Sequence, residues 1–216
     1  MRDLWTSLRA PLTAIALTLG LGFLLVASIT DDPVRAYRDL LFANFDSLSN
    51  FALFLNRATP LALIAIGIVF AFRAGVFNVG GEGQLFAGAI TAAMIGIALP
   101  DLPAPILMPL VILGGISAGA VLGWVPGVLK VRLGVDEVVV TLMLNTITLL
   151  FTSYLVNQVI RDPKSYGAIS LTVPSSIWLP SIPGVPNATG GFLIAVLVAA
   201  VSWVLIFRTV WGADLR

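Results

Sequence analysis

Apolar stretches long enough to cross a lipid bilayer recur along this chain and constrain its fold more than any other feature. A bilayer core of about 30 Å needs roughly 20 apolar helical residues. Such segments are predicted to be helices, because lipid cannot satisfy the backbone groups of an open sheet edge. We therefore predict an all-α, polytopic membrane helix bundle in which residues 1–216 form a single transmembrane domain. Six segments are predicted to be transmembrane helices, at residues 11–29, 58–72, 85–99, 104–129, 138–160 and 192–207.

Composition excludes most other classes of protein. Hydrophobic residues make up 58% of the 216 residues and charged residues only 11%, against about 25% charged in a soluble domain. The net charge of +1 gives no basic field that would attract nucleic acid. The chain has neither cysteine nor histidine, which removes the usual nucleophile, general base and metal ligands. No Gly-Lys-Ser or Gly-Lys-Thr phosphate loop is present. We expect no enzyme activity, catalytic residue, metal or cofactor.

The segments between the apolar stretches are of two kinds. Residues 31–57 mix charged and apolar side chains, which predicts a loop with a short amphipathic helix at the membrane interface. Residues 161–191 are rich in proline and glycine, which predicts an ordered, exposed loop. The first apolar stretch follows two arginines, as in a signal peptide, but it is too long and lacks an Ala-x-Ala site. We expect it to remain as an uncleaved helix.

The second and third stretches are each 15 residues long, or about 22 Å as a helix, which is short of a full crossing unless flanking residues are recruited. Between them lies the glycine-rich run Asn78-Val-Gly-Gly-Glu82-Gly-Gln84. Short membrane helices that meet at such a break often mark a substrate site. This pattern predicts a glycine-rich break with Asn78, Glu82 and Gln84 in a solute pathway. The alternative is an inner-side loop in which Glu82 is hydrated or paired with Arg73.

Four polar residues recur along the fifth stretch at intervals of four, three and four, which places them on one helical face. They are Thr141, Asn145, Thr148 and Thr152. A threonine can return its hydroxyl to its own backbone, whereas a buried amide without partners costs several kcal/mol. Two interpretations stay open: hydrogen bonds between helices, or a polar face that lines the solute pathway.

Small residues recur every fourth position in the third and fourth stretches. They are Gly88, Ala92 and Gly96, and Gly115, Gly119 and Gly123. This spacing predicts tight helix packing, because small residues let helix backbones approach closely in lipid. A sliding surface in a moving transporter is the alternative interpretation.

Basic residues predict the orientation. Six spans place both termini on one side, where seven basic residues would lie, against five on the other side. The seven lie at the termini and in short loops, where the positive-inside rule applies. We therefore predict that both termini are cytoplasmic. The seven are Arg2, Arg9, Arg73, Lys130, Arg132, Arg208 and Arg216, and the five are Arg35, Arg38, Arg57, Arg161 and Lys164.

Two runs resemble a known family. The first is Thr59-Pro60-Leu61 followed by Phe70-Ala-Phe-Arg73-Ala-Gly-Val-Phe-Asn78-Val-Gly-Gly-Glu82-Gly-Gln84, and the second is Gly134-Val-Asp136-Glu137-Val-Val-Val-Thr141-Leu-Met-Leu-Asn145. They are similar to bacterial ABC importer permeases of the nucleoside and simple-sugar branch, which are related to ribose and branched-chain amino acid permeases. The resemblance implies a permease in the bacterial inner membrane, as a homodimer or heterodimer. It also implies partners: cytoplasmic ABC ATPase subunits, a second permease subunit and an extracytoplasmic solute-binding protein.

Members of that family are longer, so we expect this chain to be an N-terminal portion, incomplete at its C-terminus. The loop that contacts the ATPase would follow Arg216. Two other functions stay open. An ion-coupled secondary transporter would use Glu82 as its proton or sodium site, and a non-transporting scaffold subunit would tolerate replacement of its polar intramembrane residues.

Overall fold

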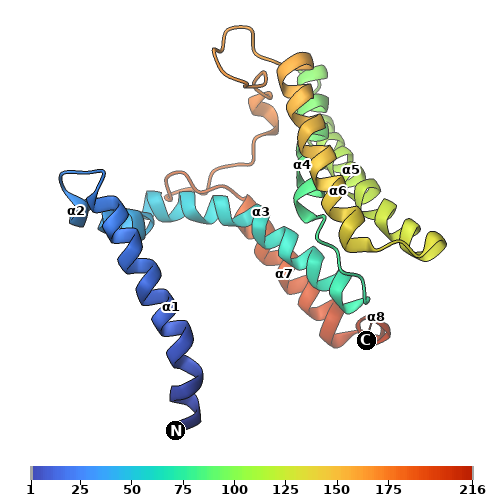
Figure 1. Ribbon diagram of the computed structural model, residues 1–216. Helices are drawn as coiled ribbons and strands as arrows, with labels where there is room; N and C mark the ends of the chain where they lie inside the picture. The colour runs from blue at the N-terminus through green and yellow to red at the C-terminus, as the bar shows by residue number, and fades with distance from the viewer. Residues whose placement is uncertain (1, 216) are drawn as a thin grey trace. The chain divides into compact units, whose positions relative to one another are not determined.

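The chain is helical throughout the part that the computed structural model describes, which is residues 2–215 for the backbone and 9–215 for the side chains (Figure 1). Within it, six helices are long and apolar enough to cross a membrane and no strand forms, which confirms the predicted fold class. These are α1 (Arg2–Ala27), α3 (Leu48–Arg73), α4 (Gly81–Ala98), α5 (Ala104–Leu133), α6 (Glu137–Tyr154) and α7 (Gly191–Arg208). The side chain of Arg2 and all of Arg216 lie outside the described part.

The second span is longer than predicted. Helix α3 begins at Leu48, so the prediction that it covers only residues 58–72 is wrong. Two hydrogen bonds explain the early start: the Asn50 backbone N–H donates to Ser47 Oγ at 3.1 Å, and Asn50 Nδ2 donates to the Ala43 carbonyl at 2.8 Å. The helix then continues through Arg57, the charged residue that precedes the predicted start of this span at residue 58.

The third span also begins earlier than predicted, at Gly81 instead of residue 85. The chain leaves the helical state only over residues 74–80. Of the three clustered glycines, Gly81 and Gly83 lie in the first turn of α4, and only Gly80 lies in the connection. Flanking residues therefore lengthen both spans, which makes each long enough to cross a bilayer.

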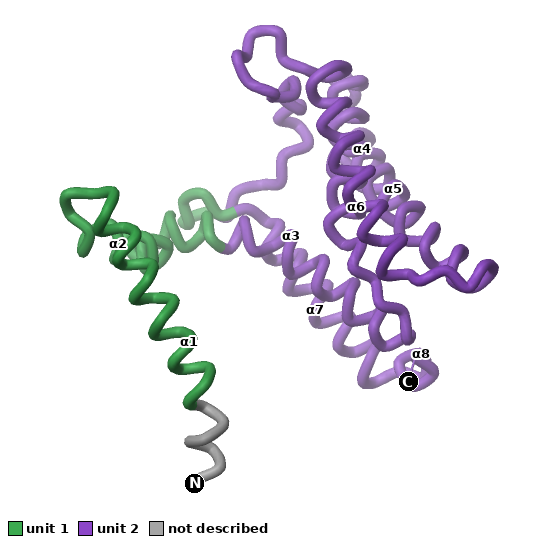
Figure 2. The backbone as a smooth tube through the Cα atoms, viewed as in Figure 1, with its two compact units in different colours: residues 1–54, 183–188 green, residues 55–182, 189–216 purple. Residues whose placement is uncertain are grey.

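The described helices fall into two compact units (Figure 2). The first comprises residues 1–54 and 183–188. Its helix α2 (Pro33–Phe42) starts at Asp32, whose Oδ1 accepts the Arg35 backbone N–H at 3.1 Å. The Tyr37 hydroxyl of α2 donates to the Leu19 carbonyl of α1 at 2.6 Å, and its ring packs edge-on against Phe23. A short helix in this segment was predicted, and the structure confirms it.

The second unit comprises residues 55–182 and 189–216. Helix α4 packs most extensively against α5 and also packs against α6, which makes a three-helix bundle. Helix α6 ends in one π-helical turn (Leu155–Val159) before the proline-rich loop. Two isolated bridges, Arg161–Ser170 and Ser181–Thr189, order that loop, and its short 3₁₀ helix (Ser175–Ile177) packs against α5.

Residues 55–73 of α3 run alongside α7 in the second unit (Figure 1). Near the start of α7, Asn56 Oδ1 accepts hydrogen bonds from the backbone N–H and the hydroxyl of Thr189, at 3.2 and 3.0 Å. At the other end, the Arg73 guanidinium lies over the Phe207 ring, 4.6 Å from its centroid. A short helix α8 (Val210–Asp214) follows α7.

Candidate functional site

The side-chain amide of Asn145 joins α6 to the start of α4. Asn145 Oδ1 accepts the Gly83 backbone N–H at 2.8 Å, and Asn145 Nδ2 donates to the Val79 carbonyl at 3.0 Å. The first amide groups of a helix have no partner within the helix. Asn145 satisfies one of these groups in α4 and one carbonyl of the preceding loop, so both ends of its amide are engaged.

Small residues make this close approach possible. A Cβ atom on Gly83 would lie 2.7 Å from Asn145 Oδ1 and 3.0 Å from Asn145 Cα. A Cβ atom on Gly80 would lie 3.2 Å from Thr141 Cβ. The Thr141 side chain is 1% exposed, and its hydroxyl donates to the Glu137 carbonyl of its own helix at 2.8 Å. Thr141 therefore packs under the loop instead of facing an open space.

Asn78 and Gln84 lie on a cavity of about 510 Å³ between α3, α4 and α5. Asn78 Oδ1 accepts the Gly80 backbone N–H at 2.8 Å and Gln84 Nε2 at 3.5 Å. Among the described residues, Asn78 Nδ2 and Gln84 Oε1 make no hydrogen bond. The two amides that line this cavity therefore keep unused hydrogen-bonding capacity. Its other lining residues include Pro60, Leu63, Ile64, Gly67, Ile68 and Ile116.

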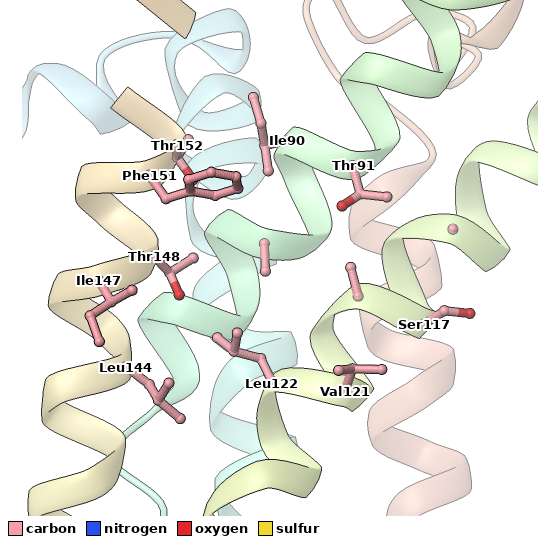
Figure 3. A pocket seen from close by; sticks show the side chains of 13 residues that line it. Ile90, Thr91, Ser117, Val121, Leu122, Leu144, Ile147, Thr148, Phe151 and Thr152 are labelled. Carbon is pink, nitrogen blue, oxygen red and sulfur yellow. The ribbon is translucent and has the colours of Figure 1, made fainter. Parts of the chain in front are cut away.

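Thr148 and Thr152 line a different cavity, of about 600 Å³, between α4, α5 and α6 (Figure 3). Figure 3 shows Thr148 and Phe151 of α6 on one side of this space and Ile90 and Thr91 of α4 on another. The Thr152 hydroxyl is buried and has no partner in the described part of the chain. The predicted pathway residues therefore do not converge on a single cavity.

Glu82 is exposed in the first turn of α4, where a carboxylate interacts favourably with the helix dipole. Among the described side chains it forms no ion pair, and the expected alternative pairing with Arg73 is absent. The Arg73 guanidinium instead stacks on Phe207.

An ion pair that the sequence did not predict joins Lys130 to Glu137. Lys130 Nζ also donates to the Gly75 carbonyl at 3.1 Å, and Glu137 Oε1 accepts the Phe77 backbone N–H at 3.3 Å. The pair therefore joins the end of α5, the start of α6 and the loop before α4. The sequence places these two opposite charges on either side of a short turn between helices, and this pattern could have predicted the pair.

The glycine stripes have distinct neighbours. A Cβ atom on Gly88 would lie 3.0 Å from the Gly115 carbonyl oxygen, so α4 and α5 touch backbone to backbone there. Ala92 also lies against Gly115. Gly119 and Gly123 face Gln84, whereas Gly96 faces Ile177 of the proline-rich loop instead of α5.

Residues 50–216 match the protein family described as branched-chain amino acid transport system, permease component. The chain belongs to this family. Its members are permease components of transport systems, and six candidate spans within the described residues agree with a multi-pass membrane protein.

The permease also matches curated relatives over most of its length. It is 34% identical over 97% of its residues to the guanosine ABC transporter permease protein NupP of Bacillus subtilis. It is 28% identical over 95% to the nucleoside ABC transporter permease protein NupB of Lactococcus lactis. It is 27% identical over 97% to the glucose ABC transporter permease protein TsgB13 of Haloferax volcanii. The permease spans 60%, 59% and 58% of these three relatives. No solved structure matches it significantly.

Proposed function

We propose that this chain forms part of a transmembrane permease subunit in an ATP-driven importer of nucleosides or simple sugars. Membership of the permease family carries the proposal, and the guanosine, nucleoside and glucose permeases among its relatives support the solute class. ATP hydrolysis takes place on separate cytoplasmic ATPase subunits. The family gives no support to an ion-coupled transporter or a scaffold subunit.

The polar solute contacts Asn78 and Gln84. Both residues line a cavity of about 510 Å³, within the range of about 300–1,000 Å³ that is usual for small-molecule sites, and their amides keep unused hydrogen-bonding capacity. A neutral amide pair can hydrogen-bond a base or a sugar hydroxyl without requiring a charged solute. The larger cavity is lined mainly by apolar side chains, with Thr148 and Thr152 among its few hydroxyl groups, and forms a second part of the pathway. Asn145 and Thr141 position the loop between α3 and α4, and Glu82 is exposed at the start of α4.

The subunit pairs with a second permease subunit, as a homodimer or heterodimer, and receives its solute from an extracytoplasmic solute-binding protein. It lies in the cell membrane with both termini in the cytoplasm. The basic residues Lys130 and Arg132 at the end of α5 support this orientation.

Uptake of radiolabelled guanosine and glucose tests the proposed function, in cells that carry the complete operon with or without this subunit. We expect saturable uptake of one solute class, lost when the subunit is removed and lost when the ATPase is inactivated. Uptake that survives an inactive ATPase but stops on collapse of the ion gradient would instead identify an ion-coupled transporter.

The cavity assignment is tested by Gln84→Met, which keeps the length of the side chain and removes its amide. We expect uptake at low solute concentration to fall by roughly tenfold, because one hydrogen bond contributes about 0.5–1.5 kcal/mol and an unpaired solute group costs more. Gln158→Met is the matched control, because Gln158 is exposed in the π-helical turn after α6. Equal uptake by both variants would place the solute elsewhere.

A further inference from the structure

Two arginines stack on one pair of aromatic rings where α3 and α7 end. Trp203 and Phe207 lie one turn apart on α7, with ring centroids 6.1 Å apart. The guanidinium carbon of Arg208 lies 5.5 Å from the Trp203 centroid, and that of Arg73 lies 4.6 Å from the Phe207 centroid. Arg73 is the last residue of α3 and Arg208 the last residue of α7. Both charges therefore lie at the ends of candidate membrane spans.

Neither charge has an anionic partner in the described part of the chain. The ion pairs among residues 9–215 join Arg38 to Asp46 and Lys130 to Glu137. One terminal nitrogen of Arg73, Nη1, is buried and donates no hydrogen bond. A buried charged donor without an acceptor leaves its lost hydration uncompensated. Arg73 as a whole is only half-buried and Arg208 is exposed, so the other N–H groups of Arg73 and those of Arg208 are the donors that an external anion can reach.

The geometry favours a phosphate group as that acceptor. A ring contacts the face of a guanidinium and not its edge, so the N–H groups at the accessible edge can still meet the oxygens of a phosphate, whose geometry the planar fork matches. At the end of a membrane span the abundant anions are lipid headgroups, and basic pockets between helices bind such headgroups. Trp203 and Trp211 are 52% and 80% exposed, and tryptophan is enriched at headgroup depth.

We propose that Arg73 and Arg208 bind the phosphate of an anionic lipid between the ends of α3 and α7. Trp203 and Phe207 hold the two guanidinium groups at the membrane surface. This lipid site uses none of the residues assigned to the solute cavities, so its test does not depend on which solute the protein transports.

Native mass spectrometry of the full chain in mixed micelles tests the site, with phosphatidylglycerol and phosphatidylcholine of identical acyl chains as probes. We expect phosphatidylglycerol to bind roughly tenfold more tightly, since a charge-assisted hydrogen bond contributes about one order of magnitude to a binding constant. Arg73→Gln should abolish this preference, and Arg208→Gln should reduce it. Arg132→Gln is the matched control, because Arg132 is an exposed arginine at the end of α5.

A second variant keeps the test decisive if Arg73→Gln does not fold. Phe207→Leu removes the ring beneath Arg73 without changing the charge, and we expect it to weaken the preference severalfold. Equal binding of both lipids by the unchanged protein would overturn the proposal and point to a protein carboxylate as the acceptor. Equal losses in Arg73→Gln and Arg132→Gln would also overturn it, as would displacement of the lipid by inorganic phosphate at equal concentration. Persistence of the lipid in the presence of phosphate supports the site.

Discussion

At the scale of single residues, the two hydrogen bonds of Asn145 connect segments that lie more than 60 positions apart in the chain. The amide accepts from the first turn of α4 and donates to the loop before it. Leucine at this position would leave the part-buried Gly83 N–H and the Val79 carbonyl without these hydrogen bonds. Each orphaned group costs about 1–3 kcal/mol.

We therefore expect Asn145→Leu to lower the stability of the purified protein by roughly 2–5 kcal/mol, or to reduce the amount of folded protein recovered. Asn145→Asp should lose less, because it keeps the acceptor for Gly83. Thermal unfolding in detergent measures the difference. Thr146→Val serves as the control, because the Thr146 hydroxyl returns to the Leu142 carbonyl of its own helix. A fully stable leucine variant with impaired uptake would instead favour direct contact with solute.

Glycine positions give a second comparison at this scale. A Cβ atom on Gly83 would overlap Asn145, whereas one on Gly127 would meet no atom within 4 Å. We expect Gly83→Ala to destabilise the bundle by about 1–3 kcal/mol through overpacking. Gly127→Ala should be neutral or stabilise α5 by up to about 1 kcal/mol, because alanine favours the helix. Midpoints of thermal unfolding compare the two variants, and a loss of equal size in both would contradict the steric explanation.

At the scale of helices, the Lys130–Glu137 ion pair connects the turn between α5 and α6 to the loop between α3 and α4. Lys130 reaches the Gly75 carbonyl and Glu137 reaches the Phe77 N–H, so each charge also contacts the loop backbone. The pair is partly exposed to solvent, with side-chain exposures of 34% and 15%. A partly exposed pair contributes little to global stability. Its effect should therefore be local.

Lys130→Met should speed amide hydrogen exchange in residues 74–80 by about fivefold, equivalent to roughly 1 kcal/mol, with little change in the unfolding midpoint. Mass spectrometry of peptides that cover this loop measures the rate. Arg132→Met is the control, because Arg132 lies on the same helix and forms no ion pair among the described side chains. Unchanged exchange in the Lys130 variant would show that Asn145 alone holds the loop.

At the scale of the whole molecule, the number of spans determines which loops share a side of the membrane. With α6 and its π-helical turn as a single span, Arg132 and Ser170 are predicted to lie on opposite sides of the membrane. The basic end of α5 is predicted to face the cytoplasm.

Reporter fusions at these two positions should give opposite signals, with the cytoplasmic reporter active at Arg132 and the external reporter active at Ser170. A third fusion, in the loop at residue 101 between α4 and α5, is the internal control and should match Ser170. Identical signals at Arg132 and Ser170 would exclude the six-span arrangement.

Several features followed from the sequence alone. The membrane class, the all-α fold and the number of spans depend on hydropathy, which each segment carries by itself whatever its neighbours. The short α2 helix followed from a local mixture of charged and apolar residues. Boundaries that depend on polar residues were less predictable: the second span was predicted to begin at residue 58, after Arg57, yet capping at Ser47 starts α3 at Leu48.

The tertiary structure decided what the polar residues contact. Thr141, Asn145, Thr148 and Thr152 share one face of α6, and periodicity gives them one role. The structure separates them, because Asn145 finds backbone partners on the α4 side and Thr148 and Thr152 line a cavity with α4 and α5. The pairing of Lys130 with Glu137 and the stacking of Arg73 on Phe207 likewise depend on distances between segments. The hydropathy of a segment depends only on its own residues, so the sequence is enough to determine it. Hydrogen bonds and ion pairs require two groups within a few ångströms of each other, and only the packing of the helices brings such groups together.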